Sequence, residues 1–248
     1  MRIPQLDGER GVSPLVMKRF LLLSSVLAAA ALALAPGASA RIVELGATAN
    51  PANPSCPTDP CVAVVRVTGY QGRAAGGPKN PYYIRRDGYI VAFTVTLSQP
   101  SAEQSTFFND NYGSPAQVQL SVLRKGKTRK TRLQHRLVQE TEPFEVDDYF
   151  GSSPTFTLPE PLRVKEGNWI ALTVPTWAPM LAINLTKSDW WRSSRAKGSC
   201  EPPKSLRQFA MDELRGVNVF GCTYSGARLL YTATYIPDNR PTVTEEGE

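Results

Sequence analysis

The chain has 248 residues, of which 42% are apolar and 20% charged, as in a globular protein rather than a disordered one. Its net charge of +6 is too small to imply a polyanionic partner by itself. The single histidine, His135, argues against zinc sites built from two or three imidazoles. No G-x-S-x-G elbow, phosphate-binding loop or dinucleotide fingerprint is present, so the common enzyme motifs are excluded.

Residues 1–40 are predicted to be a cleaved signal peptide. The basic pair Lys18-Arg19 precedes an apolar run over 20–35, and small residues at 38–40 form a cleavage pattern. This run is shorter than the ~20 residues of a membrane-spanning helix, so we expect an exported chain. An uncleaved N-terminal anchor is the alternative. Met17 directly precedes the basic pair, which suggests the hypothesis that translation begins there and that residues 1–16 are an over-extended start of the reading frame.

Four cysteines in an exported chain predict two disulfides rather than a metal site. Three pairings are possible. Short separations along the sequence favour Cys56–Cys61 and Cys200–Cys222. The two-residue Cys-x-x-Cys spacing of redox and zinc motifs is absent, so neither chemistry is expected.

The exported part is predicted to contain one domain. Residues 41–60 are interpreted as an N-terminal tether or edge strand, 61–237 as a β-sandwich domain, and 238–248 as an acidic disordered tail. The sequence has no internal repeat and no linker long enough to divide the domain. A domain of this size buries roughly 70% of the surface of its unfolded chain, which is enough for one core.

Alternating apolar residues predict about ten short strands, the pattern of a sandwich or barrel. The first strand, at 61–67, leads into a Gly-rich loop over 69–77. Asp87-Gly88 predicts a two-residue hairpin turn between 82–84 and 89–97, with Tyr89 and Phe93 on one face and Ile90 on the other. Further strands are expected at 117–122, 132–139, 155–158, 169–174, 181–185, 217–220 and 229–236.

One short helix is predicted over 206–214. Ser205 and Gln208 have the spacing of a capping box, and Gly216 follows as a stop signal. Leu206, Phe209, Ala210 and Leu214 would share one helical face. We expect this helix to lie over an open edge of the sandwich.

The sequence at 161–172 resembles the Leu-x-Val-x-x-Gly-Asp-x-Ile-x-Leu hairpin of jelly-roll, galactose-binding-like β-sandwich domains, with Asn168 in place of Asp. The resemblance covers about a dozen residues and carries over no ligand-binding residue. It implies an all-β fold, a jelly-roll-like antiparallel β-sandwich with one short helix after a cleaved signal peptide. Many such domains bind sugars or cell surfaces.

The segment 124–136 is strongly basic, and acidic residues follow at 140–148. We expect these opposite charges to neutralise one another across neighbouring strands. An anion-binding strip for nucleic acid or an acidic wall polymer is the alternative, but the strip has no aromatic residue to stack on bases. Its basic residues are Arg124, Lys125, Lys127, Arg129, Lys130, Arg132 and Arg136.

Residues 109–113 resemble the first half of a calcium loop. The position that should hold a bidentate Glu is Leu120, so an Asx-rich turn is predicted instead. Calcium held by separate loops, with Asp147 and Asp148 contributing, stays open as the alternative. No other metal and no cofactor is expected.

Three tryptophans and Arg192 are the candidate ligand-binding residues. Trp177 lies between two prolines where a strand is expected to end, and Trp190-Trp191 precede Arg192 in a polar segment. Neighbouring side chains of a strand face opposite ways, so at least one of the adjacent rings should lie outside the core. An exposed ring beside polar groups suits a sugar. The alternative is that these rings plug the end of the sandwich.

These features predict a secreted, non-catalytic β-sandwich protein that binds an extracellular carbohydrate or cell-envelope surface, with no nucleic-acid partner and no membrane contact after signal removal. A structural or protein-interaction domain without a small-molecule site is one alternative. A glycan-acting hydrolase is another and would need two facing carboxylates. His135 is expected to be exposed or at the core edge rather than to act as a base. The candidate carboxylates are Glu140, Glu142, Glu145, Asp147, Asp148, Glu160 and Glu166.

Overall fold

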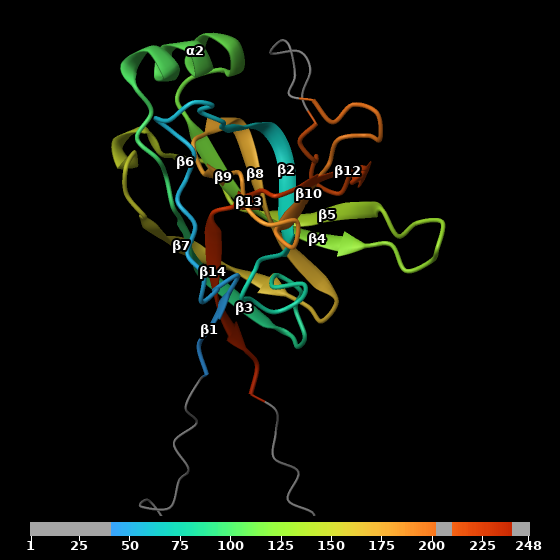
Figure 1. Ribbon diagram of the computed structural model, residues 1–248. Helices are drawn as coiled ribbons and strands as arrows, with labels where there is room; N and C mark the ends of the chain where they lie inside the picture. The colour runs from blue at the N-terminus through green and yellow to red at the C-terminus, as the bar shows by residue number, and fades with distance from the viewer. Residues whose placement is uncertain (1–40, 202–209, 240–248) are drawn as a thin grey trace, which may run out of the picture. The chain divides into compact units, whose positions relative to one another are not determined.

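Antiparallel strands dominate the computed structural model, which describes residues 41–201 and 210–239 (Figure 1). The fold is mostly β and sandwich-like, as predicted, and includes a sheet curled into a half-barrel. The predicted signal peptide, the first part of the predicted helix and the tail beyond residue 239 lie outside the described residues.

The smaller sheet has four strands in the order β1-β14-β3-β7, all antiparallel. β1 is an edge strand paired with the last strand of the domain, so the start of the described chain is hydrogen-bonded to its end. The strands are β1 (Val43–Leu45), β3 (Gly88–Val95), β7 (Thr155–Val164) and β14 (Tyr231–Pro237).

The larger sheet has the order β11-β5-β4-β8-β2-β10-β12, and the short β6 also pairs with β4. A separate pair joins β13 (Arg228–Leu229) to β9 (Leu181–Ala182). The strands of the larger sheet are β2 (Val64–Arg73), β4 (Gln117–Lys125), β5 (Gln134–Glu140), β6 (Phe144–Glu145), β8 (Asn168–Ala178), β10 (Trp190–Ser193), β11 (Val217–Val219) and β12 (Cys222–Ser225).

β8 lies in the middle of the larger sheet and is buried along both faces. Its alternate side chains divide between two apolar clusters because neighbouring residues of a strand face opposite ways. Ile170 and Leu172 join the main core, whereas Trp169 and Ala171 join a second cluster. The second cluster is completed by Tyr70, Leu123, Leu137 and Phe220.

His135 packs against the second cluster and is fully buried, so it is neither exposed nor at the core edge. Its ring centroid lies 4.3 Å from that of Phe220 and 5.3 Å from that of Tyr70. Burial lowers the pKa of His135 to about 4, and the charges of Lys125 and Arg192 act in the same direction. The imidazole is therefore neutral at neutral pH and contributes as an aromatic core residue.

We expect the free energy of unfolding to fall as the pH drops from about 6.5 to about 4. In this window the unfolded chain binds a proton at His135 that the folded chain does not, which favours unfolding by about 3 kcal/mol. His135→Phe keeps a ring in the cluster and should remove this part of the pH dependence. Urea unfolding of both proteins across the window measures it, and parallel pH profiles would contradict the assignment.

The pairing of β3 differs from its predicted alternation. Tyr89 is 42% exposed, whereas Ile90 and Phe93 are both fully buried. The register against β7 shifts between Ile90 and Ala92, and a β-bulge of this kind moves the following side chains to the opposite face. The prediction that Tyr89 and Phe93 share a face is therefore wrong, because alternation along a sequence does not reveal a bulge.

The predicted hairpin at Asp87-Gly88 does not form. Tyr83 bridges Trp169 at the start of β8, and β3 pairs with β14 and β7 instead. Gly88 is the first residue of β3, where the backbone of Ile236 leaves no space for a Cβ atom. This glycine allows two strands to approach closely rather than forming a tight turn.

The segment at 161–172 is not a hairpin either, because β7 pairs with β3 and β8 pairs with β4 and β2. The chain crosses here from the smaller sheet to the larger one. Gly167 takes a φ of +87°, and the Asn168 side chain accepts a hydrogen bond from the Lys165 backbone N–H at 2.8 Å. An amide oxygen thus stabilises the crossover turn at the position where the resembling domains have Asp.

The predicted loop over 69–77 is mostly strand, because β2 continues to Arg73. A Cβ atom on Gly69 would lie 2.9 Å from the ring of Trp191, and one on Gly72 would overlap the ring of Trp190. The two glycines therefore make room for indole rings from the neighbouring strand. The local sequence suggested a loop because it contains many glycines. The indole rings that require these glycines are more than a hundred residues away in the chain.

The α-helix of the described residues is α2 (Ala102–Tyr112), which the sequence analysis missed. Ser101 and Gln104 form a capping box, and Gly113 ends the helix with a φ of +100°. Residues 109–113 are thus the end of a helix, and the predicted Asx-rich turn is wrong. The helix lies at one end of the sheets, beside β8 (Figure 1).

The predicted helix at 206–214 is not formed over its described part. Ala210 makes a parallel bridge to Val67, and residues 211–214 have no helical hydrogen bonding. Asp212 is buried here, with its backbone N–H donating to the Thr68 hydroxyl at 3.0 Å. This segment is held as extended chain along β2 by tertiary contacts, which override its helical periodicity.

Both predicted disulfides are present. Cys56 pairs with Cys61, and Cys200 pairs with Cys222. The described residues contain no free cysteine. The pairing that short separations along the sequence favoured is therefore confirmed and is consistent with an extracellular protein.

Candidate ligand-binding groove

Trp177 is a core residue and not part of a binding surface. Its side chain is fully buried, its ring stacks on Phe108 with centroids 4.8 Å apart, and its Nε1 donates to Asn109 Oδ1 at 2.8 Å. β8 continues through Pro175 instead of ending before Trp177. The predicted ligand-binding role of Trp177 is wrong because α2, the missed helix, covers this ring.

The other two tryptophans lie on opposite faces of β10. Trp191 is buried, and its ring is covered by Gly69 on β2 and by Tyr224, whose centroid lies 4.3 Å away at an interplanar angle of 18°. Trp190 is half-buried against Gly72. Arg192 has its guanidinium 5.8 Å from the Trp190 ring centroid. The structure therefore leaves no broad face of Trp191 free to stack on a sugar.

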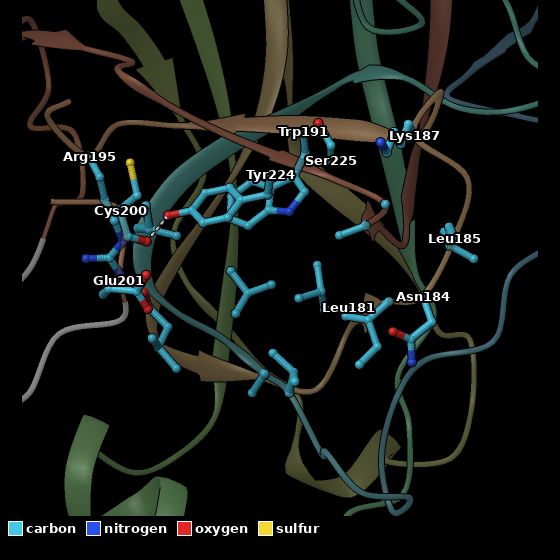
Figure 2. A pocket seen from close by; sticks show the side chains of 18 residues that line it. Leu181, Asn184, Leu185, Lys187, Trp191, Arg195, Cys200, Glu201, Tyr224 and Ser225 are labelled. Carbon is cyan, nitrogen blue, oxygen red and sulfur yellow. Dashed lines mark hydrogen bonds between the residues drawn. The ribbon is translucent and has the colours of Figure 1, made fainter. Parts of the chain in front are cut away.

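A groove opens beside Trp191 and has a volume of about 980 Å³. We call it the Trp191 groove. Figure 2 shows Trp191 and Tyr224 along one side, with Leu181 and Asn184 on the other. Half of the lining residues are aliphatic, namely Val62, Ala63, Val64, Val65, Val67, Leu181, Ile183, Leu185 and Ala227.

Charged side chains lie at the two ends of the Trp191 groove. Arg195 and Glu201 lie at one end and Lys187 at the other (Figure 2). Arg195 is only 7% exposed, and its guanidinium donates to the Val65 carbonyl at 2.8 Å. No carboxylate in 41–201 or 210–239 forms an ion pair with it. Burial lowers the pKa of Arg195, since the charged form is partly dehydrated.

The cysteine bridge positions this end of the groove. Cys200 is linked to Cys222 on β12, and the Tyr224 hydroxyl donates to the Cys200 carbonyl at 2.5 Å, the dashed line in Figure 2. Tyr224 in turn stacks on Trp191. The disulfide, the tyrosine and the indole thus form one connected wall.

The arrangement can bind but offers no catalytic pair. Glu201 is the one carboxylate among the described lining residues, and a glycosidase needs two. His135 is buried against the other apolar cluster, beside Tyr70 and Phe220. Within the described ranges, no three His, Cys, Asp or Glu side chains are grouped to hold a metal ion, and Asp147 Oδ2 instead accepts from the Ala116 N–H at 2.8 Å.

Asp189, which precedes the two tryptophans, is also not a surface group. Its side chain is 2% exposed and forms an ion pair with Arg228. The carboxylate also accepts hydrogen bonds from the Ala75 N–H and the Thr186 hydroxyl. The polar segment that suggested a sugar-binding surface therefore contributes structural contacts.

Sequence reasoning missed most of the groove. It identified Trp191 but not Arg195, Tyr224 or the aliphatic wall. Arg195 lies only three residues after Arg192, the last residue of the predicted ligand-binding segment. The only local hint of its role was an arginine that follows two serines. The wall itself is assembled from segments far apart in the chain and has no local signature.

Comparison with known protein families, with curated proteins and with solved structures finds no match for this chain. The assignment of a function therefore depends on the site itself. In the part of the chain that the structure describes, no helix is long and apolar enough to cross a membrane.

Proposed function

We propose that this protein is an exported, non-catalytic binding protein with a jelly-roll-like sandwich, which holds an anionic, acyl-bearing component of the cell envelope in the Trp191 groove. The signal-peptide pattern and the two disulfides support export. The observation that carries the proposal is a buried guanidinium without a carboxylate partner among the described residues, at the end of an aliphatic groove.

The lining of the groove favours a hydrocarbon over a bare sugar. Sugar-binding sites offer an open aromatic face, but Trp191 is only 5% exposed and Tyr224 stacks on its ring. Branched aliphatic side chains such as Val65 and Ile183 instead provide a continuous apolar surface. The volume lies at the upper end of the range of small-molecule sites, which is enough for an acyl chain.

Arg195 favours an anionic head group. A buried charge that lacks a counter-ion is costly, and an arriving carboxylate or phosphate would supply one with bidentate geometry. Lys187 adds positive charge at the other end of the groove, against the single carboxylate of Glu201. A lipid or glycolipid whose anionic group lies beside Arg195 and whose chain lies along Val65 satisfies both parts of the groove.

Binding of palmitate, hexadecanol and cellohexaose, measured by calorimetry, tests the proposal. We expect palmitate to bind at least about tenfold more tightly than hexadecanol, because only palmitate offers a charge to Arg195. Cellohexaose should not bind. Ala63→Phe fills the groove and should abolish palmitate binding, whereas Ala102→Trp, at the exposed start of α2, should not.

Arg195→Gln separates the two parts of the proposal. It should reduce the preference for palmitate over hexadecanol while leaving hexadecanol binding unchanged. Palmitate binding that survives Ala63→Phe would place the site elsewhere. Equal affinity for palmitate and hexadecanol would remove the anionic head group from the proposal, and binding of cellohexaose alone would favour a carbohydrate module.

A further inference from the structure

The basic strip at 124–136 is not neutralised by the acidic residues that follow it. In the β4–β5 pair, Arg124 lies directly opposite Arg136 and Lys125 opposite His135. The acidic side chains lie at the far end of β4, with Glu140 opposite Ser121. No residue of the strip forms an ion pair with any described carboxylate. The predicted self-pairing is therefore wrong, because the antiparallel register places like charges together.

A pocket of about 710 Å³ lies beside this strip, between the β4–β5 hairpin and the crossover turn of β7 and β8. We call it the cationic pocket. Five cationic side chains line it against the single carboxylate of Glu166. The cations are Arg124, Lys125, Lys127, Arg163 and Lys165. Arg163 is held in a bidentate ion pair with Asp238, which leaves four cations for a ligand.

Aromatic rings form one wall of the cationic pocket and hold the Lys125 side chain in place. Lys125 Nζ lies 5.5 Å from the ring centroid of Trp169, which is itself 6% exposed. Tyr70 and Tyr83 pack against the same indole, with centroids 4.8 and 5.5 Å away. Burial lowers the pKa of Lys125, and the positive charges of Arg192 and Arg132 lower it further. An anion bound here would relieve this repulsion.

The strip also extends beyond the pocket. Lys127, Arg129 and Lys130 are exposed on the loop that joins β4 to β5, which projects from the fold in Figure 1. Charge that continues from a pocket along a projecting loop matches a ligand with repeated anionic groups rather than a single small anion. Arg192, one of the predicted ligand-binding residues, contributes to this positive field.

We propose that the cationic pocket and the adjoining loop bind an anionic polysaccharide, at a site independent of the Trp191 groove. The aromatic rings argue against single-stranded nucleic acid, since Lys125, Tyr70 and Tyr83 cover Trp169 and leave no platform on which a base could stack. Sulfate or carboxylate groups on successive sugars need only the cations. The disulfides are consistent with an extracellular setting, where such polymers occur.

Binding of the full mature chain to immobilised heparin at low ionic strength tests this site. The variant Arg124→Gln, Lys125→Gln, Lys165→Gln removes three charges of the pocket. A matched control, Arg41→Gln, Lys79→Gln, Lys197→Gln, removes three exposed charges elsewhere. We expect the pocket variant to bind at least about tenfold more weakly and the control to stay within about twofold of the wild type.

A second variant guards against loss of packing at Trp169, which Lys125 covers. Lys127→Glu with Lys165→Glu changes only two exposed side chains and should weaken binding to a similar extent. Palmitate binding, measured in parallel, should be unchanged in both variants because the groove is a separate site. Neutral dextran should not bind.

Three results would overturn the proposal. Equal loss of heparin binding in the pocket variant and the matched control would show that binding depends on the net charge of the protein and not on the pocket. Absence of heparin binding by the wild type would remove the site. Tighter binding of single-stranded DNA than of heparin, lost in the pocket variant, would assign the site to nucleic acid instead.

Discussion

Replacing Trp177 by alanine is expected to lower the free energy of unfolding by about 3 to 5 kcal/mol. The indole is fully buried at the end of β8, where it packs between Phe108 and Phe150 and donates a hydrogen bond to Asn109. Truncation leaves a cavity under α2 and an amide oxygen without its donor. Urea unfolding followed by circular dichroism measures the change.

Trp177→Phe serves as the graded control, because it keeps a ring against Phe108 and loses only the hydrogen bond and part of the volume. We expect it to cost about half as much as the alanine variant. Trp190→Ala, at a half-buried position, should cost less again. A small effect of Trp177→Ala on stability, together with lost ligand binding, would restore the surface role that the sequence suggested.

Replacing Arg228 by methionine should destabilise the protein by a similar amount, about 3 to 5 kcal/mol. Arg228 and Asp189 form an ion pair with side chains only 6% and 2% exposed. Arg228 Nε donates to Asp189 Oδ1 at 2.9 Å, and its Nη1 donates to the Asn50 carbonyl at 2.6 Å. Methionine fills much of the space but leaves a buried carboxylate without a cation.

The double variant Arg228→Met, Asp189→Leu isolates the cause. It removes both charges, so it should recover most of the stability that Arg228→Met loses. Burial raises the pKa of Asp189, but hydrogen bonds from Ala75, Arg228 and Thr186 outweigh it and hold this pKa below its usual value. A double variant no more stable than Arg228→Met would show that lost packing, and not the orphaned charge, causes the effect.

The strands and disulfides could be predicted because their signals are local. The alternation of Val118, Leu120 and Val122 survives in β4, where all three side chains are fully buried. The pairing of Cys56 with Cys61 follows from a separation of five residues. Neither feature requires knowledge of the rest of the chain.

Pairing partners, in contrast, could not be read from local patterns. Ser101 and Ser205 both begin a Ser-x-x-Gln sequence. The helix was predicted after Ser205, whereas the observed helix begins after Ser101. The bulge at Ile90 and the register that brings Arg124 opposite Arg136 depend on strands that lie elsewhere in the sequence. For this reason, proximity in the sequence wrongly predicted that the acidic residues at 140–148 neutralise the basic strip.

The candidate site shows the same limit. Trp191 was identified from its polar neighbours, but one of them, Asp189, is buried against Arg228. Residues that line the Trp191 groove come from β2, from the segment after β9 and from β12. Only the three-dimensional pairing brings Val65, Ile183 and Tyr224 together.

The crossover turn between β7 and β8 gives ligand binding a consequence for stability. Lys165 and Asn168 connect the two sheets, and both also line the cationic pocket. A polymer held there would touch strands of both layers at once and act as a clamp against their separation. Because only the assembled layers present this surface, occupancy would raise the melting temperature by mass action.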